Sequence, residues 1–551
     1  MVIEAKLCNI TSRITPKFFN SVHHCISTLI ISERGFMLIR FILISAMLLL
    51  ASNAQASTVN IIPSTVTVTK GSEAKYYLLT QEKDNFSENI SISGLPEGTT
   101  WNLHCTGTRG DNCKNEYGSD DLPIFTLNVN IPSSAKIGSY DIKIQSNLKN
   151  NIFQSFKLQV VEPIQFTHPG VLLNTKMLTN IKNTLIERDP IRYKAFLSAK
   201  NSKYGNLHYQ PHPHSSVNSD NDTGVDYRED AIAAYTQALL WGITEDSHYA
   251  DNAIAIMNAW SQALNSNLQG ANRFNLAAWS GDVWPRAAEI IRYTYLKANG
   301  VSVWSSSDID NFSQMLKKYT VDFINNQYFT SGNYGGNLLS SQAAAFINIG
   351  IFNNDTGTFL NGLDRLRKML PAYIYMKKDG VIPMPPYFWR NSYISSTSLL
   401  SSAGYWRGQN FNSPSIGEGG LSQETCRDIG HVLWGLSALA NGMESARIQG
   451  YNLSKEETLG TLNALRLKYA SEYNTNFYND GSAIQPDSAN NPCGKKIDLG
   501  SSVGKGELIL NELTNRRQLA LPNTELFIQS SRPTGASYFM IWETLTHYQN
   551  P

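Results

Sequence analysis

The feature that most limits how this chain can fold is a change in the spacing of its apolar residues. From Ser57 to about Val161, short runs such as Thr65–Thr69 and Phe125–Asn130 alternate apolar with polar residues, and turns rich in Gly, Pro and Asn separate them. Alternation with a period of two is typical of half-buried strands. Beyond Asn174 the apolar residues recur at helical spacing. Because the two patterns bury different faces, we expect two structural units.

The first unit is predicted to be a β-sandwich over residues 57–162, because about seven short strands occupy about a hundred residues. Its segments Thr69–Ser72, Ser93–Gly98 and Ile137–Asp141 resemble bacterial immunoglobulin-like (Ig-like) domains appended to secreted enzymes. No cluster of catalytic residue types stands out in this unit. We therefore interpret it as a spacer or an accessory binding domain.

The second unit, residues 163–551, is predicted to be all-α. Its first amphipathic helix is expected over Thr175–Leu185. Further helices are expected over Glu229–Gly242, His248–Leu264, Ala277–Asn299, Ser307–Asn325, Leu338–Phe352, Thr358–Tyr375, Ser422–Gly450 and Lys455–Phe477. Antiparallel helix pairs around a cleft would form an α/α toroid, and an irregular helical array would give much the same pattern.

A signal peptide is predicted over residues 37–56. Met37–Arg40 gives a basic start, Phe41–Leu50 an apolar core, and Ala54–Ala56 a small-residue cleavage site. Residues 1–36 are interpreted as a gene-model extension. We therefore expect a secreted or periplasmic protein with no membrane attachment after the signal is removed.

Removal of this segment leaves an even number of cysteines in an oxidising compartment, where disulfides persist. Cys105 and Cys113 flank a turn-rich heptapeptide, which favours a disulfide between them. By elimination, Cys426 would pair with Cys493. No set of closely spaced Cys and His resembles a structural zinc site.

The charge balance limits the classes of binding partner that we expect. The 551 residues carry a formal net charge of +1, and no basic run is interleaved with aromatic residues. Nucleic-acid binding is therefore not expected. An acidic substrate remains compatible with this neutrality, since its recognition can be local. We expect a monomer without a cofactor.

Polar chemistry is concentrated in Gly417–His431, at the start of a long apolar helical pattern. If this stretch is helical, Arg427 and His431 share one face, and Glu424 and Asp428 lie on a neighbouring stripe. Two carboxylates, a guanidinium and an imidazole are costly to desolvate unless they pair with each other or with a ligand. The stretch is predicted to form one wall of an active site.

Several blocks of the helical unit resemble the alginate-lyase superfamily of polysaccharide lyases. They are Asp230–Thr244, Tyr249–Ser261, Trp284–Thr294, Pro371–Tyr375, Gln423–His431, Arg532–Gly535 and Trp542–His547. The resemblance extends over roughly residues 165–548. It implies an incomplete α/α toroid and β-elimination on a uronic-acid polysaccharide.

Such a reaction requires a neutralised uronate carboxylate, a base for the C5 proton and an acid for the departing O4. In this superfamily an Asn and an Arg or His hold the carboxylate, a Tyr or His transfers protons, and no metal is needed. The resemblance assigns Asn337 to the carboxylate, although an N-cap would also use Asn. Arg427 and His431 match the family's Arg-Asp-x-x-His. Whether His431 acts as base or as carboxylate clamp stays open.

Other candidates are weaker, since each could equally be a packing residue. Tyr405, in a stretch expected to be flexible, is the preferred catalytic acid. Trp279 and Arg286 are expected to bind substrate: they are seven residues apart on one helical face, and Trp279 could stack on a sugar. Tyr227 is expected in a loop near the substrate, and Glu424 is expected to orient Arg427 at the substrate.

One departure from the family keeps other functions open. Leu338 and Leu339 stand where an aromatic and an acidic residue commonly follow the family's Asn. A secreted lyase for alginate or a similar polyuronate is the main hypothesis. The alternatives are a glycan-binding protein derived from a lyase, and a glycoside hydrolase that uses paired carboxylates such as Asp282 and Glu424.

Overall fold

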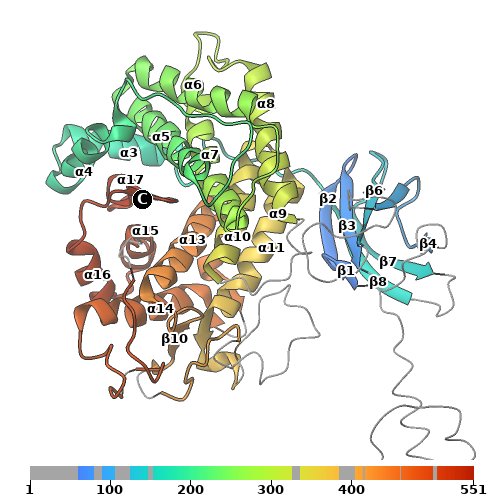
Figure 1. Ribbon diagram of the computed structural model, residues 1–551. Helices are drawn as coiled ribbons and strands as arrows, with labels where there is room; N and C mark the ends of the chain where they lie inside the picture. The colour runs from blue at the N-terminus through green and yellow to red at the C-terminus, as the bar shows by residue number, and fades with distance from the viewer. Residues whose placement is uncertain are drawn as a thin grey trace, which may run out of the picture.

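The computed structural model describes residues 60–79, 90–105, 124–146, 153–325, 336–381, 383, 404–413, 416–458, 461–489, 491–500 and 506–551. Figure 1 shows the eight N-terminal strands gathered beside a larger region built of helices. Within the described ranges, no helix combines the length and the apolar composition needed to span a bilayer.

The N-terminal strands form two four-stranded sheets. The strands are β1 (Asn60–Ile62), β2 (Thr65–Thr69), β3 (Glu73–Leu79), β4 (Ile90–Ser93), β5 (Thr100–Cys105), β6 (Ile124–Asn130), β7 (Gly138–Ser146) and β8 (Phe153–Val161). One sheet has the order β1-β3-β6-β5 and the other the order β2-β8-β7-β4. The pairing of β2 with β8 is parallel, and the remaining neighbours are antiparallel.

The two sheets share one apolar core because alternate residues of each strand point inward. Tyr76 of β3 and Phe156 of β8 meet across the sheets with ring centroids 4.5 Å apart. The Tyr76 hydroxyl also donates to the Lys157 carbonyl of the facing sheet at 2.7 Å. The predicted strand region is confirmed, although β5 was missed even though its sequence, Thr-Trp-Asn-Leu-His-Cys, alternates polar with apolar residues. The predicted partner of Cys105, Cys113, lies outside the described residues.

The rest of the chain is helix-rich, as predicted. Its helices are α3 (Thr175–Ile186), α4 (Pro190–Lys200), α5 (Asp222–Thr244), α6 (Ser247–Ala263), α7 (Arg273–Thr294), α8 (Ser306–Leu316), α9 (Phe323–Asn325), α10 (Gly336–Phe352), α11 (Thr356–Tyr373), α13 (Ile429–Ile448), α14 (Asn463–Asn479), α15 (Glu507–Leu510), α16 (Pro522–Gln529) and α17 (Glu543–His547). A π-helical segment, Lys317–Asp322, interrupts the predicted helix Ser307–Asn325.

Helix α10 lies at the centre of this region, and every one of its residues is buried. It packs against α7, α11 and α13, and α7 in turn packs against α5 (Figure 1). The approach of α11 is close: a Cβ on Gly350 would lie 2.5 Å from the Phe359 backbone nitrogen, and a Cβ on Gly362 would lie 2.7 Å from Ile347. These positions therefore exclude any larger residue without a shift of the helices.

A buried carboxylate joins three of the central helices. Asp282 of α7 is ion-paired with Arg286 at 2.8 Å, accepts from Asn348 of α10 at 2.6 Å and accepts from Asn441 of α13 at 2.9 Å. Arg286 also donates to the carbonyl of Phe539 at 2.9 Å. A fully buried charge is tolerated only when it is paired and hydrogen-bonded in this way.

Phe539 belongs to a hairpin formed by β13 (Ala536–Ser537) and β14 (Met540–Ile541). A second contact fixes this hairpin, because the indole of Trp542 donates to Thr236 of α5 at 2.8 Å. The C-terminal part of the chain is thereby attached to both α5 and α7.

The stretch Gly417–His431 is not one helix, so the helical prediction for it is wrong. Gly419–Ser422 forms β10, which pairs with β9 (Ile374–Met376), and a turn follows. Asp428 then caps α13 by accepting from the His431 backbone N–H at 2.8 Å. Asp is a strong N-cap, because its side chain satisfies an otherwise unpaired amide. Arg427 and His431 therefore do not share a helical face.

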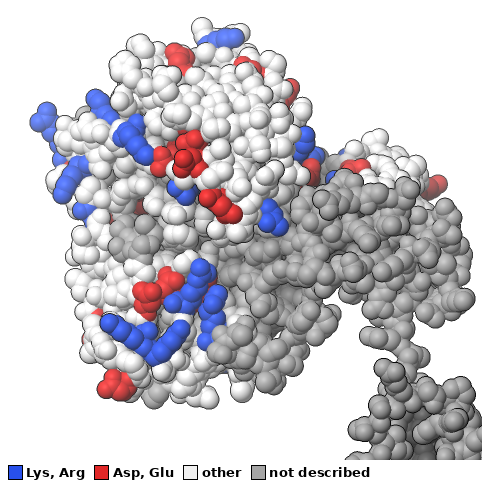
Figure 2. Space-filling view, viewed as in Figure 1, with Lys and Arg blue, Asp and Glu red and all other residues white. Residues whose placement is uncertain are grey.

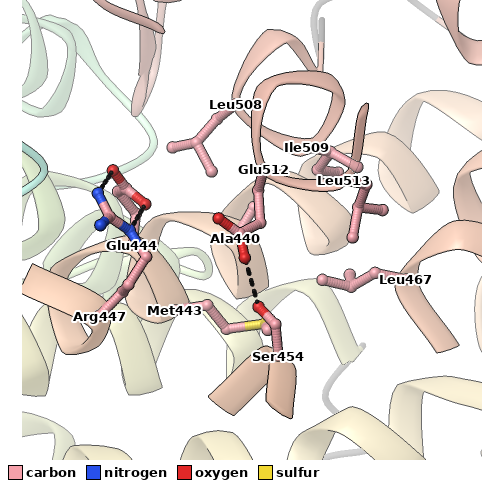
Figure 3. Close-up of a pocket in the computed structure, with 10 residues that line it drawn as sticks. All are labelled: Ala440, Met443, Glu444, Arg447, Ser454, Leu467, Leu508, Ile509, Glu512 and Leu513. Atoms are coloured by element: carbon pink, nitrogen blue, oxygen red, sulfur yellow. Dashed lines mark hydrogen bonds and ion pairs between the residues drawn. The ribbon is translucent and has the colours of Figure 1, made fainter. Parts of the chain in front are cut away.

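Several charged residues in the interior of the helical region pair with one another. A small cavity between α13, α14 and α15 is lined by apolar side chains and by Glu444, Arg447, Ser454 and Glu512 (Figure 3). Glu444 accepts bidentate hydrogen bonds from Arg447 and from Arg516 at 2.7 to 3.0 Å. Burial raises the pKa of Glu444, but the two guanidinium groups outweigh this effect and lower the pKa to about 2.

Glu444→Gln is expected to destabilise the protein by about 3 kcal/mol at neutral pH, because Arg447 loses its carboxylate and Arg516 keeps only that of Glu512. The carboxylate's contribution is present above its unfolded-state pKa of about 4.3 and is lost as the pH falls towards 2. Thermal unfolding measured from pH 7 to pH 3 should therefore show that the difference in stability between wild type and variant becomes smaller as the pH falls. Glu245→Gln, which removes an exposed partner of Lys182, should have a much smaller effect. An equal effect of both variants would contradict the expectation.

Candidate active site

A groove of about 300 Å³ opens where the N-terminal ends of α5, α7 and α13 meet the β13–β14 hairpin. Its lining comes from four separate parts of the sequence. The lining residues are Ser219, Gly224, Val225, Arg228, Asn272, Leu276, Trp279, Arg427, His431, Trp434 and Tyr538. The volume is at the lower end of the range for small-molecule sites.

The groove is basic, although the chain as a whole is nearly neutral. Two arginines and a histidine line it, and none of the described residues that line it is Asp or Glu. The N-terminal ends of helices also attract anions, because their amide dipoles point outward. The face shown in Figure 2 carries basic and acidic side chains separated by wide neutral areas. The groove therefore favours an anionic ligand through local charge.

His431 is held in one orientation by the residue that caps its helix. Its Nδ1 lies 2.5 Å from Asp428 Oδ2. Burial raises the pKa of Asp428, but hydrogen bonds from His431 outweigh this effect and the pKa is lowered overall. The ionised carboxylate favours the tautomer with the proton on Nδ1, which leaves Nε2 with a free lone pair. His431 therefore presents a basic nitrogen in the groove.

Arg427 is fixed by Glu424, which is fully buried. Arg427 Nη1 donates to Glu424 Oε1 at 2.9 Å. The same carboxylate accepts from the Asn337 amide at 2.8 and 2.9 Å and from the Tyr373 hydroxyl at 3.2 Å. Burial and the nearby Glu424 raise the pKa of Tyr373, which keeps it a hydrogen-bond donor. Since a guanidinium has five N–H donors, Arg427 retains donors for a ligand.

Aromatic rings form one side of the groove. Trp434 lies 5.1 Å from His431 and 4.5 Å from Tyr538, measured between ring centroids. Trp279 lies 4.7 Å from Tyr538 and 5.4 Å from Trp434. Aromatic rings of this kind present apolar surface to a ligand.

Tyr538 adopts a strained backbone conformation. It is the first residue of the two-residue loop between β13 and β14, and its φ is +54°. Gly, Asn or Asp is preferred at such a position, and a bulky residue costs of order 1 kcal/mol or more. The cost is tolerated because the loop is held on both sides: Arg286 binds the Phe539 carbonyl, and the guanidinium of Arg228 lies 4.4 Å over the Tyr538 ring.

The predicted disulfide between Cys426 and Cys493 is confirmed, with a Cα–Cα distance of 5.3 Å. It attaches residues 493–500 beside the start of α13. In that segment the Asp498 carbonyl accepts from the Ile429 N–H at 2.9 Å. The bond therefore supports the turn that carries Arg427 and the cap of α13.

The structure brings only part of the predicted site together. Trp279, Arg427 and His431 line the groove. Asn337, 3% exposed, and Glu424 lie behind Arg427 and do not line it. The predicted contact of Asn337 with substrate therefore stays a prediction that its burial does not support, whereas Glu424 does contact Arg427 as expected.

Three predicted residues are buried away from the groove. Tyr405 packs with Tyr375, Trp406 and Leu421, and burial raises its pKa. Tyr227 lies within α5 rather than in a loop and packs against aromatic residues of the core. Arg286 is ion-paired with Asp282 inside the protein. These placements argue against direct contact of the three side chains with substrate.

Arg228 and Tyr538 are among the groove residues that were not predicted from the sequence. Arg228 directly follows the suspected Tyr227 but was not singled out. Tyr538 lies between two blocks of the family resemblance, Arg532–Gly535 and Trp542–His547, and that proximity is the signal that could have identified it. Among the residues that the structure describes, no three or more His, Cys, Asp or Glu side chains converge to hold a metal ion.

Asp428→Asn is expected to change the proton position on His431 without unfolding α13. Asn remains a good N-cap, but its NH₂ group would face Nδ1 and disfavour the Nδ1–H tautomer. ¹⁵N chemical shifts of His431 should therefore show the proton moving towards Nε2.

Asp246→Asn is a matched control. Asp246 caps α6 and contacts His248 Nδ1 at 2.7 Å, but this pair is exposed. Water can replace the contact there, so the His248 tautomers should change little. Unchanged His431 shifts in Asp428→Asn would contradict the expected role of Asp428.

Comparisons with known proteins identify the family of part of this chain. No curated protein matches it. Among solved structures, it is similar to the BIgI domain of beta protein from S. agalactiae bound to CEACAM1, with 11% identity over 19% of this chain and 97% of that chain and a TM-score of 0.12. A score this low carries no argument about the fold. Residues 187–384 match the model of the alginate lyase family, a range that ends before Arg427 and His431. The chain therefore contains a domain of the alginate lyase family.

Proposed function

We propose that this protein cleaves a uronic-acid polysaccharide, alginate or a similar polyuronate, by β-elimination. The family domain supports polysaccharide lyase activity at the family level. The single observation that carries the finer proposal is the groove, in which Arg427 and an oriented His431 face a space whose described lining has no carboxylate. Such a groove suits a carboxylated sugar and a proton abstraction beside its carboxylate.

The proposal assigns each step to one residue that lines the groove. Arg427 binds the uronate carboxylate, which makes the C5 proton more acidic. His431 Nε2 removes that proton, and the electron pair forms the C4–C5 double bond while the C4–O4 bond breaks. The Tyr538 hydroxyl donates a proton to the departing O4. The products are an unsaturated uronate at the new non-reducing end and a free hydroxyl at the new reducing end.

A glycoside hydrolase is the less well supported alternative. An inverting hydrolase needs two carboxyl groups facing each other across the cleft. The suggested pair, Asp282 and Glu424, is fully buried, and each carboxylate is occupied by hydrogen bonds within the protein. A lyase-derived protein that binds glycans without cleaving them would share the groove, and turnover assays distinguish it.

Two further elements belong to the proposal. An α/α toroid is the arrangement that the family resemblance implies for the helical region. Export to the periplasm or the medium is supported by the pattern of residues 37–56 and by the Cys426–Cys493 disulfide, because such bonds persist in oxidising compartments.

The proposal predicts that the protein without residues 1–56 generates ultraviolet absorbance from an unsaturated product on at least one of alginate, glucuronan and the glycosaminoglycans. His431→Ala should lower kcat at least about a hundredfold, because the base is lost. His248→Ala is the matched control, since His248 also pairs with an N-cap aspartate but is exposed. Absence of product across the whole panel, or full activity of His431→Ala, would overturn the proposal.

Tyr538→Phe is expected to reduce kcat about a hundredfold or more with little change in KM, because the ring that packs on Trp434 remains and only the proton donor is removed. The comparison is Tyr193→Phe, which alters an exposed tyrosine of α4 and should leave kcat unchanged. Steady-state kinetics on the polymer identified above separate the two parameters. A rise in KM at constant kcat would assign Tyr538 to binding alone.

A further inference from the structure

Arg228 differs from most arginines of the helical region in having no acidic partner. Among the described residues, no carboxylate lies within ion-pair distance of its guanidinium, and no hydrogen bond joins the guanidinium to another side chain or backbone group. Its acidic neighbours on α5 are engaged elsewhere: Asp226 contacts His214 at 2.8 Å, and Glu229 contacts Lys203 at 2.6 Å. Arg228 is half-buried in the groove with its charge uncompensated.

By contrast, the charge of Arg427 is largely compensated. Glu424 lies 2.9 Å from it and Asp428 lies 3.8 Å from it. The more strongly attractive position for an additional anion in the groove is therefore at Arg228. A planar guanidinium with free N–H donors is suited to grip a carboxylate with two parallel hydrogen bonds.

The ring contacts place Arg228 against Tyr538, the proposed proton donor to O4, and link it to His431 through Trp434. Arg228 lies over Tyr538 at 4.4 Å, Tyr538 packs on Trp434 at 4.5 Å, and Trp434 packs on His431 at 5.1 Å. Two aromatic rings thus lie between Arg228 and the proposed base. A sugar whose C5 proton faces His431 would leave Arg228 beside the neighbouring sugar.

We propose that Arg228, stacked on Tyr538, forms a second carboxylate subsite that selects polymers with uronates on consecutive sugars. The assignment of the ligand as a polyuronate rests on the proposed lyase function. The binding of an anion by Arg228 does not depend on that function. In a polymer that alternates uronate with a neutral hexosamine, the neighbouring sugar has no carboxylate for Arg228. Such a polymer leaves the guanidinium desolvated without a partner, which lowers its affinity.

The test is calorimetric binding in a His431→Ala background, which prevents cleavage. The probes are an alginate tetrasaccharide, which has consecutive uronates, and a hyaluronan tetrasaccharide, in which uronates alternate with N-acetylhexosamine. Arg228→Gln should weaken binding of the first about ten- to a hundredfold and change binding of the second less than about twofold. Arg228→Lys, which keeps the charge but not the paired donors, should give an intermediate loss.

Arg273→Gln is the control for a general field effect. Arg273 starts α7 next to the groove residue Asn272, but its guanidinium donates to the Gly270 carbonyl and lies over Phe274. The Arg273→Gln substitution removes the same charge as Arg228→Gln and should not change the affinity for either probe. Three results would each overturn the subsite. Arg273→Gln could weaken binding as much as Arg228→Gln does, Arg228→Gln could weaken binding of both probes equally, or Arg228→Gln could leave binding of both probes unchanged.

The outcomes also separate this inference from the proposed lyase activity. Discrimination by Arg228 in a protein that yields no unsaturated product would support the subsite and reject the lyase. Turnover of polyuronate whose binding is unaffected by Arg228→Gln would reject the subsite and support the lyase. Thermal unfolding of each variant checks that the loss of packing on Tyr538 has not unfolded the hairpin.

Discussion

The structure of the helical region depends on the carboxylate of Asp282. It joins α7, α10 and α13 through Arg286, Asn348 and Asn441. These contacts satisfy a charge that would otherwise be very costly to bury. Because α7 and α13 both line the groove, the position of one helix relative to the other there is set by this buried contact. Through Arg286 and the Phe539 carbonyl, the same contact also fixes the strained loop that carries Tyr538. Arg286, proposed from sequence as a ligand residue, thus supports the site from inside the protein.

The groove combines two electrostatic conditions that normally oppose each other. An arginine that is to bind substrate must be held still, yet its usual anchor is a carboxylate, which reduces its attraction for an anion. Here Glu424 is buried behind Arg427 and is stabilised by Asn337 and Tyr373, so it orients the guanidinium without lining the groove. Asp428 similarly orients His431 while capping α13. Both carboxylates act from behind the wall, and the face towards the ligand stays basic.

Features that depend on neighbouring residues, such as most helices and strands, could be predicted from the sequence. Features that depend on contacts between distant segments were predicted less well. Alternating and helical spacing located most strands and helices, and counting cysteines led to the Cys426–Cys493 pair. The helical prediction for Gly417–His431 failed because Asp428 is a strong cap, which starts the helix only at Ile429. Arg427 and His431 still line one groove, for a tertiary reason that spacing could not reveal. Tyr227, Arg286 and Tyr405 were plausible by residue type, but burial depends on contacts made by remote elements such as the β13–β14 hairpin. Tyr538 reaches the groove only because that hairpin folds back onto α5 and α7.

The strained loop links stability to function. If Tyr538 were only a packing residue, a glycine would suit its φ of +54° better. The phenol gains a further role if the ring positions two different groups: its hydroxyl towards the departing oxygen, and its face beneath Arg228. In that arrangement one side chain couples the chemical step to recognition of the neighbouring sugar. A ligand that engages Arg228 would then also hold Tyr538 in its reactive position, so binding energy away from the scissile bond would contribute to catalysis.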